Sequence, residues 1–128
     1  MPIRGIRGAT TITADQADLV HEATQELLTA ILTANPDLRQ EDVGSILFSM
    51  TEDITSAYPA LAARQMGWDH VPMMCVREIP VKDSLQLCIR VLIDWNTNFN
   101  QIAIKHVYLR GASILRPDLS DGSGGKTS

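Results

Sequence analysis

The sequence predicts a single α+β domain in which a small mixed sheet of five or six strands packs against two main helices. Its 128 residues fit one domain, and 45% of them are hydrophobic while 20% are charged, as in an average globular protein. Apolar residues alternate in some segments, as in strands, and recur every three or four positions in others, as in helices. We expect residues 1–119 to form this domain and the Gly- and Ser-rich residues 120–128 to be a disordered tail.

The first strand and the first helix are predicted in the N-terminal part of the chain. Residues 3–13 combine Ile and Thr with glycines and two arginines, a mixture typical of a strand. Residues 13–16 have the spacing of a capping box and are expected to open a helix. Asn35-Pro36 should end this helix, because the residue before a proline is pushed out of the α region. Its apolar stripe consists of Val20, Ala23, Leu27 and Ile31.

Two strands and a short helix are predicted in the middle of the chain. Residues 43–50 form a short apolar run that is typical of a buried strand. A second helix is predicted over residues 60–66, because Pro59 suits a first helical turn and Gly67 suits the position after the last one. Residues 71–79 are predicted to be a third strand, irregular at its start because it contains a proline.

The C-terminal third of the chain is predicted to supply the remaining strands. Residues 87–95 alternate in character, which predicts two distinct faces. One face carries Leu87, Ile89, Val91, Ile93 and Trp95, and the other carries Cys88, Arg90, Leu92 and Asp94. Residues 105–109 and 112–115 are predicted to be the last two strands, separated by Gly111. A small sheet of this kind has edges that must be covered, and self-association is one way to cover them.

Composition and motifs exclude several classes of function. The net charge of −4 argues against a general nucleic-acid binder. No apolar run approaches the roughly 20 residues of a membrane span, and no secretory signal is visible, so we expect a cytoplasmic protein. Cys75 and Cys88 are not expected to form a disulfide there. The cysteines and the three histidines lack metal-ligand spacing, and no phosphate-loop or dinucleotide motif occurs, so no metal or cofactor is predicted.

Arginine and one glutamate mark the candidate site. The chain has eight Arg but only three Lys, and Arg is favoured where a planar fork grips a carboxylate or phosphate. Arg90 stands in the middle of an apolar strand, so it must face a carboxylate, an interface or a ligand. Glu78 is a natural partner for it, and Arg7 lies in the first strand between glycines. These residues suggest a cationic pocket for a small, multiply anionic metabolite, although purely structural Arg–carboxylate pairing is the common alternative.

Several blocks of sequence between residues 3 and about 120 together carry a family resemblance. They are Ile3 to Thr11, Tyr58-Pro59-Ala60, Arg64, Gly67-Trp68, Val71-Pro72, Cys75 with Glu78, Cys88-Ile89-Arg90-Val91, His106 to Leu109, and Ile114 to Leu119. In this order they resemble the bacterial monofunctional chorismate mutases of the trimeric α/β class, as distinct from the all-helical class. Any one block would be weak evidence, whereas the ordered set is specific.

The resemblance implies both an activity and an assembly. The activity is the intramolecular rearrangement of chorismate to prephenate on the route to phenylalanine and tyrosine, and it needs no cofactor. The assembly is a homotrimer, a trimeric pseudo α/β barrel, with active sites at clefts between neighbouring subunits. Both agree with a cationic pocket that has no nucleophile and no metal, because the substrate is a dicarboxylate and its reaction is unimolecular.

The resemblance also implies a role for each matching residue. Arg90 would donate to the breaking ether oxygen and to a carboxylate, and Glu78 would accept from the substrate hydroxyl and help hold Arg90. Arg7 and Tyr108 would bind the side-chain carboxylate. Positive potential at the mouth would come from Arg64 and Arg116. The apolar wall would consist of Tyr58, Ala60, Met73, Met74, Cys75 and Leu115.

Two other functions compete with this one. A non-catalytic trimeric module that binds a small carboxylate metabolite would also place an Arg in a strand at a subunit interface, and so would a related small trimeric enzyme acting on imines. The combination of Arg90 with Glu78, Arg7 and Tyr108 favours the mutase, because a simple clamp for one carboxylate would not need all four.

Overall fold

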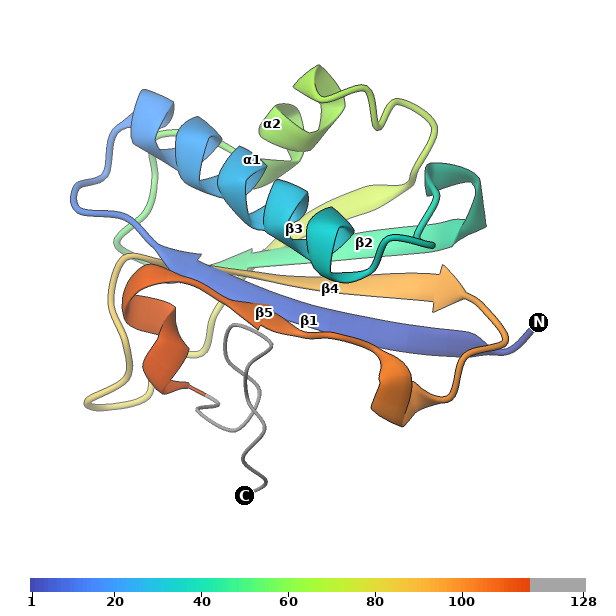
Figure 1. Ribbon diagram of the computed structural model, residues 1–128. Helices are drawn as coiled ribbons and strands as arrows, with labels where there is room; N and C mark the ends of the chain where they lie inside the picture. The colour runs from blue at the N-terminus through green and yellow to red at the C-terminus, as the bar shows by residue number, and fades with distance from the viewer. Residues whose placement is uncertain (116–128) are drawn as a thin grey trace.

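The computed structural model describes residues 1–115 and shows one mixed five-stranded sheet with two helices on one of its faces (Figure 1). Residues 116–128, and with them Arg116 and the predicted tail, lie outside the described part of the chain. The helices and strands are β1 (Ile3–Thr11), α1 (Ala17–Ala34), β2 (Val43–Met50), α2 (Pro59–Gln65), β3 (Met73–Arg77), β4 (Cys88–Asn96) and β5 (Val107–Tyr108). Short 3₁₀ helices are η1 (Gln40–Asp42), η2 (Gln101–Ala103) and η3 (Arg110–Ile114).

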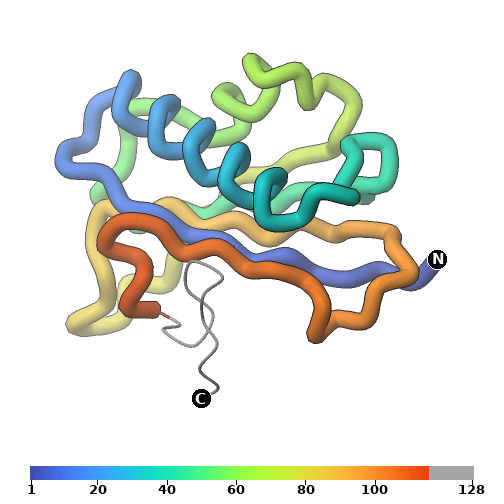
Figure 2. Tube along the Cα trace, in the orientation of Figure 1, coloured from blue at the N-terminus to red at the C-terminus, as the bar shows by residue number. Residues whose placement is uncertain are grey.

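The strand order is β3-β2-β4-β1-β5, so the edges of the sheet come from the third and the fifth strand. The central strand β4 pairs antiparallel with both β1 and β2, while β3 and β5 add parallel to the outside. Figure 2 shows β1 and the segment that contains β5, far apart in sequence, running side by side. The predicted α+β class with a small mixed sheet is therefore confirmed, and five strands are observed.

The two faces of the sheet differ sharply in character. On the face under the helices, Ile89, Val91, Ile93 and Trp95 of β4 are buried in two core clusters, both of which include residues of α1. The opposite face, which we call the open face, carries Arg90, Leu92 and Asp94 of the same strand. The alternation predicted for residues 87–95 is confirmed, since it separates the core from the face that holds the charged groups.

Three predictions differ from the structure: the start of the first helix and the two C-terminal strands. The first helix begins at Ala17 with Gln16 at its N-cap, so Thr13 lies outside the helix and the predicted capping box does not form. The strand predicted for residues 112–115 is absent, and the chain there forms η3. The last strand is also shorter than the predicted 105–109, because only Val107–Tyr108 pair with β1.

The remaining elements lie close to their predicted positions. β2 has the predicted bounds, α2 starts one residue earlier than predicted, and Gly67 follows its end with the positive φ that favours glycine. β3 is confined to the middle of the predicted 71–79 segment. Cys75 and Cys88 are both free thiols. Within residues 1–115, no helix is both long and apolar enough to cross a membrane.

Candidate active site

The open face holds a cavity of about 240 Å³ over β1, β2, β4 and β5. The register of the sheet brings its residues together, because Arg90 pairs with Ser49 on one side and with Ala9 on the other, and Ala9 in turn pairs with Tyr108. Polar groups at its wall come from Arg7, Ser49, Arg90 and Tyr108, and its apolar lining includes Leu47 and Leu92. Three of the predicted site residues, Arg7, Arg90 and Tyr108, thus share one cavity.

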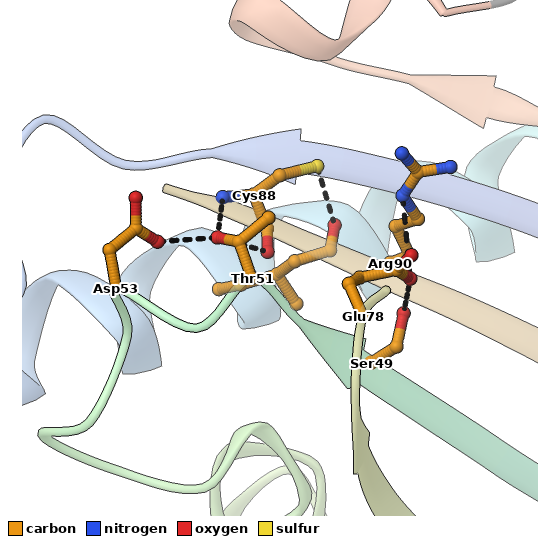
Figure 3. Close-up of polar contacts among 7 residues, drawn as sticks. Ser49, Thr51, Asp53, Glu78, Cys88 and Arg90 are labelled. Atoms are coloured by element: carbon orange, nitrogen blue, oxygen red, sulfur yellow. Dashed lines mark hydrogen bonds and ion pairs between the residues drawn. The ribbon is translucent and has the colours of Figure 1, made fainter. Parts of the chain in front are cut away.

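Glu78 borders this cavity and is bonded to two of its residues (Figure 3). Its Oε2 lies 3.5 Å from Nε of Arg90, and the same oxygen accepts a hydrogen bond from the Ser49 hydroxyl. Its backbone N–H donates to the carbonyl of Met50 at 2.8 Å, one position beyond the last pair of β3 with β2. The predicted pairing of Glu78 with Arg90 is therefore present.

The guanidinium of Arg90 contacts both Glu78 and the thiol of Cys88. Figure 3 shows its Nε toward Glu78 and its two Nη groups directed away from that carboxylate. The Arg90 side chain is 33% exposed, so the group is half-buried rather than fully enclosed. Its Nε is buried and makes the ion pair, but it forms no hydrogen bond with any described residue. Because Arg90 lines the cavity, its guanidinium can donate to a ligand there.

Tyr108 offers a second unused donor. Its side chain is buried, only 3% exposed, and its hydroxyl has no hydrogen-bond partner within residues 1–115. A buried polar group without a partner is costly, so its persistence beside a cavity indicates a binding function. The neighbouring Arg7 is exposed, and no carboxylate of the described chain lies within ion-pair distance of it. Together these groups suit an anionic ligand.

The thiol of Cys88 lies in the sheet two residues before Arg90 and is fully buried. Burial raises the pKa of this thiol to about 11, although the nearby Arg90 charge acts in the opposite direction. The thiol therefore stays protonated at neutral pH and does not act as a nucleophile there. Leu115 packs against the same small cluster, formed by Ala9, Cys88, Tyr108 and Ala112, two of which line the cavity.

The remaining predicted site residues form a second group on α2 and β3. Burial raises the pKa of the Cys75 thiol. A hydrogen bond from the backbone of Ala60 and the charge of Arg64 act in the opposite direction but are weaker. Met73 packs against the core, while Tyr58 and Met74 are 68% and 65% exposed. β3 is the edge opposite β5, and the lining of the cavity ends at Leu47 and Ser49 of the adjacent strand β2, with no residue of α2 or β3 in it. One subunit therefore does not bring this group into the cavity of Arg7, Arg90 and Tyr108.

A larger cavity of about 360 Å³ lies on the other side of Glu78 and does not fit the predicted ligand. Its lining includes the carboxylates Glu52, Asp53, Glu78 and Asp83 and contains neither Lys nor Arg. Such a wall repels a dicarboxylate. The cationic cavity on the open face is thus the better candidate.

Comparison with known proteins decides the family. The family model described as chorismate mutase type I matches residues 3–119. This chain belongs to the chorismate mutase type I family. Chorismate mutase AroH of Thermus thermophilus is 50% identical over 117 residues, which cover 91% of this chain and 96% of that protein. Chorismate mutase AroH of Bacillus subtilis (strain 168) is 43% identical over 121 residues, 94% of each chain.

The fold comparison agrees with the family assignment. The solved structure of a chorismate mutase from Clostridium thermocellum superposes with a TM-score of 0.83 at 45% identity, covering 86% of this chain and 97% of that one. The predicted family and the predicted activity, an isomerase of aromatic amino-acid biosynthesis that converts chorismate to prephenate, are confirmed. Sequence reasoning missed Ser49, Leu47 and Leu92 of the cavity, because a serine or leucine in a strand gives no signal until the register of the sheet is known.

Proposed function

We propose that this chorismate mutase works by charge stabilisation and by holding one substrate conformer, with each active site completed by a neighbouring subunit of a homotrimer. The observation that carries the proposal is the convergence of Arg7, Arg90 and Tyr108 on one cavity bordered by Glu78. Their positive and neutral donors match a dicarboxylate, and Glu78 supplies one acceptor for a hydroxyl.

The chemistry asks little of the protein beyond orientation and electrostatics. In the rearrangement the ether C–O bond breaks while a new C–C bond forms in the same molecule, so no proton or electron enters or leaves. Partial negative charge develops on the ether oxygen. An Nη group of Arg90 donates to this oxygen and becomes a stronger partner as the bond breaks, which lowers the barrier. No cofactor or metal takes part in a reaction of this kind.

The other groups of the cavity hold the substrate in its compact form. Arg7 and the hydroxyl of Tyr108 bind the side-chain carboxylate, and Glu78 accepts from the substrate hydroxyl while it orients Arg90. Fixing both ends of the molecule brings the reacting carbon atoms together, which supplies the orientational part of the rate enhancement.

A homotrimer accounts for the second group of residues on α2 and β3. Tyr58, Ala60, Arg64, Met74 and Cys75 lie at the edge opposite β5, so they reach a cavity only if that edge meets the next subunit. The open face also leaves Leu47, Val76 and Leu92 between 36% and 40% exposed, an apolar surface suited to an interface. Head-to-tail contacts of this type close into a ring. Arg116, outside the described residues, would add positive charge at the mouth.

A direct assay tests the proposal. Purified protein in buffer with EDTA and no added cofactor should remove the absorbance of chorismate and form prephenate, and light scattering should give three times 14.1 kDa. A fully active monomer would overturn the shared site, and a requirement for a metal or cofactor would overturn the electrostatic mechanism. A cytoplasmic location without nucleic-acid or membrane partners stays a prediction.

A further inference from the structure

Ser49 lies on the open face of β2 and lines the cationic cavity, where it meets the two charged groups most important to the proposed mechanism. It pairs with Arg90 in the antiparallel ladder of β2 and β4. Its hydroxyl donates to Glu78 Oε2, the same oxygen that lies 3.5 Å from Arg90 Nε. Ser49 is thus in contact with Glu78 and next to Arg90.

We infer that Ser49 is a positioning residue for the rearrangement, acting through Glu78; the inference rests on the role proposed above for that carboxylate. With Oε2 taken by Ser49 and Arg90, no described residue bonds Oε1, which is left to accept from the substrate hydroxyl. The hydrogen bond from Ser49 therefore orients the Glu78 carboxylate so that Oε1 faces the substrate.

Glu78 needs such a side-chain anchor because of its place in the chain. It follows the last paired residue of β3, and its backbone is held by the one hydrogen bond to Met50. A Glu side chain has several rotatable bonds and loses considerable freedom when it is fixed. Because the Ser49 contact already fixes the Glu78 side chain in the free enzyme, no further side-chain entropy is lost when the substrate binds.

The same strand offers a matched control. Ser45 also lies on β2, four residues earlier and on the same face, and its hydroxyl donates to Oδ2 of Asp94 at 2.8 Å. Asp94 pairs with Ser45 in β4 much as Arg90 pairs with Ser49, but neither residue lines the cavity. Replacing Ser45 removes a Ser–carboxylate contact of the same type without touching the proposed machinery.

Two alternatives must be separated from this role. If Ser49 acted independently of Glu78, its replacement would lower kcat by the same factor with and without Glu78, and a thermodynamic cycle detects this. If the Ser49–Glu78 bond only fastened the end of β3 to β2, Ser49→Ala would lower the melting temperature and leave kcat of the folded protein near wild type.

The experiment measures kcat and KM for Ser49→Ala, Glu78→Ala, the double variant and Ser45→Ala, with melting curves for each. We expect Ser49→Ala to lower kcat by about 10-fold or more, the scale for a hydrogen bond to a charged group. When Glu78→Ala is already present, adding Ser49→Ala should lower kcat by less than about twofold. Ser45→Ala should have a kcat near that of the wild type. Equal costs in both backgrounds would overturn the inference.

A second pair of variants guards against an effect of side-chain volume or folding. Ser49→Thr keeps the hydroxyl and should retain most of kcat. Ser49→Val places a side chain with nearly the shape of threonine but no hydroxyl, and its kcat should fall as far as that of Ser49→Ala. Equal kcat for Thr and Val would show that the hydroxyl is not the active group. If Glu78→Ala kept wild-type kcat, the role proposed for Glu78 would fail together with this inference. If Glu78→Ala had a low kcat and the losses in kcat from the two substitutions simply added in the double variant, only the inference about Ser49 would be overturned.

Discussion

Gly8 of β1 lies directly under Ile31 of α1: a Cβ atom added to Gly8 would stand 2.9 Å from Cδ1 of Ile31 and 3.2 Å from the carbonyl oxygen of Val107. The missing side chain lets the helix and β5 approach β1 at the same point. Because Val107 precedes Tyr108, this close approach also sets where Tyr108 enters the cavity.

Gly8→Ala should destabilise the fold, since the added methyl group meets backbone as well as side chains. We expect a loss of about 1–3 kcal/mol, the usual scale for overpacking a core, measured by thermal or urea unfolding. Gly5→Ala on the same strand is the control, because its Cβ would meet only Leu92 Cδ1 at an ordinary 3.5 Å. Equal stability of the two variants would contradict the packing argument.

Arg90→Lys should fold normally and lose most of its activity. A lysine keeps the charge but cannot present two donors in a plane to an ether oxygen and a carboxylate. We expect kcat to fall by about 10²–10³-fold, as when one preorganised donor is lost, with a smaller change in KM. Arg39→Lys, an exposed residue outside the cavity, is the control for steady-state kinetics and circular dichroism. Near-full kcat in Arg90→Lys would refute its assigned role.

Two defective variants should restore each other's activity if sites are shared between subunits. Arg90→Ala damages the cavity group and Arg64→Ala damages the group on α2, so a mixed trimer contains one site with both groups intact. Random mixing of equal amounts should return about a quarter of the sites to wild type, measured as kcat/KM after joint refolding. Separately refolded and then pooled samples are the control, and no gain on joint refolding would argue against shared sites.

The turnover rate should be nearly independent of pH between about 6 and 9. Burial raises the pKa of Cys88 to about 11, so this thiol stays protonated in this window, and burial moves the pKa of Cys75 in the same direction. The guanidinium groups stay charged throughout. We therefore expect a flat kcat profile that falls only in acid, where carboxylates take up protons. A sharp bell centred near 7 would instead reveal an acid–base pair.

Asp15 should contribute stability that disappears in acid. Hydrogen bonds from Ser56, followed by those from Thr55, hold the pKa of this carboxyl below its ordinary value of 3.8. A depressed folded-state pKa means that the contribution is present above 3.8 and is lost as the pH falls through the folded value. Asp15→Asn should lower Tm at pH 7 and weaken its fall below pH 4, while Asp69→Asn, exposed and outside this contact, should not. Identical Tm–pH curves for Asp15→Asn and wild type would contradict this.

Local patterns predicted the elements where one interaction dominates. The alternation of residues 87–95 placed Arg90 opposite the core residue Ile89, because one face of β4 is covered by helices and the other is not. The capping-box prediction was wrong because residues 13–16 stay outside the helix, in a segment where the Asp15 side chain bonds to Thr55 and Ser56, some 40 residues away. The sequence of residues 13–16 contains no information about that contact.

The sequence predicted only the part of the site that does not depend on long-range strand pairing. Family resemblance pointed to Arg7, Glu78, Arg90 and Tyr108, and the structure brings these four together. It does not bring Cys75 and its neighbours on α2 and β3 to the same cavity, because strand order is decided by long-range pairing that one chain does not reveal. Ser49 carries no motif at all and becomes visible only through its register with Arg90.

The hydroxyl of Tyr108, which no residue of the described 1–115 bonds, lowers the stability of the fold but serves the proposed reaction. Leaving a buried donor unsatisfied costs about 1–3 kcal/mol, and a phenylalanine at the same position would avoid that cost while filling the same space. Selection for heat resistance alone would thus remove the hydroxyl and, with it, one of the groups proposed to bind the substrate. A thermostabilised form of this enzyme must therefore gain its stability at positions away from the open face, and a library screened only for melting temperature would drift toward well-folded, poorly active proteins.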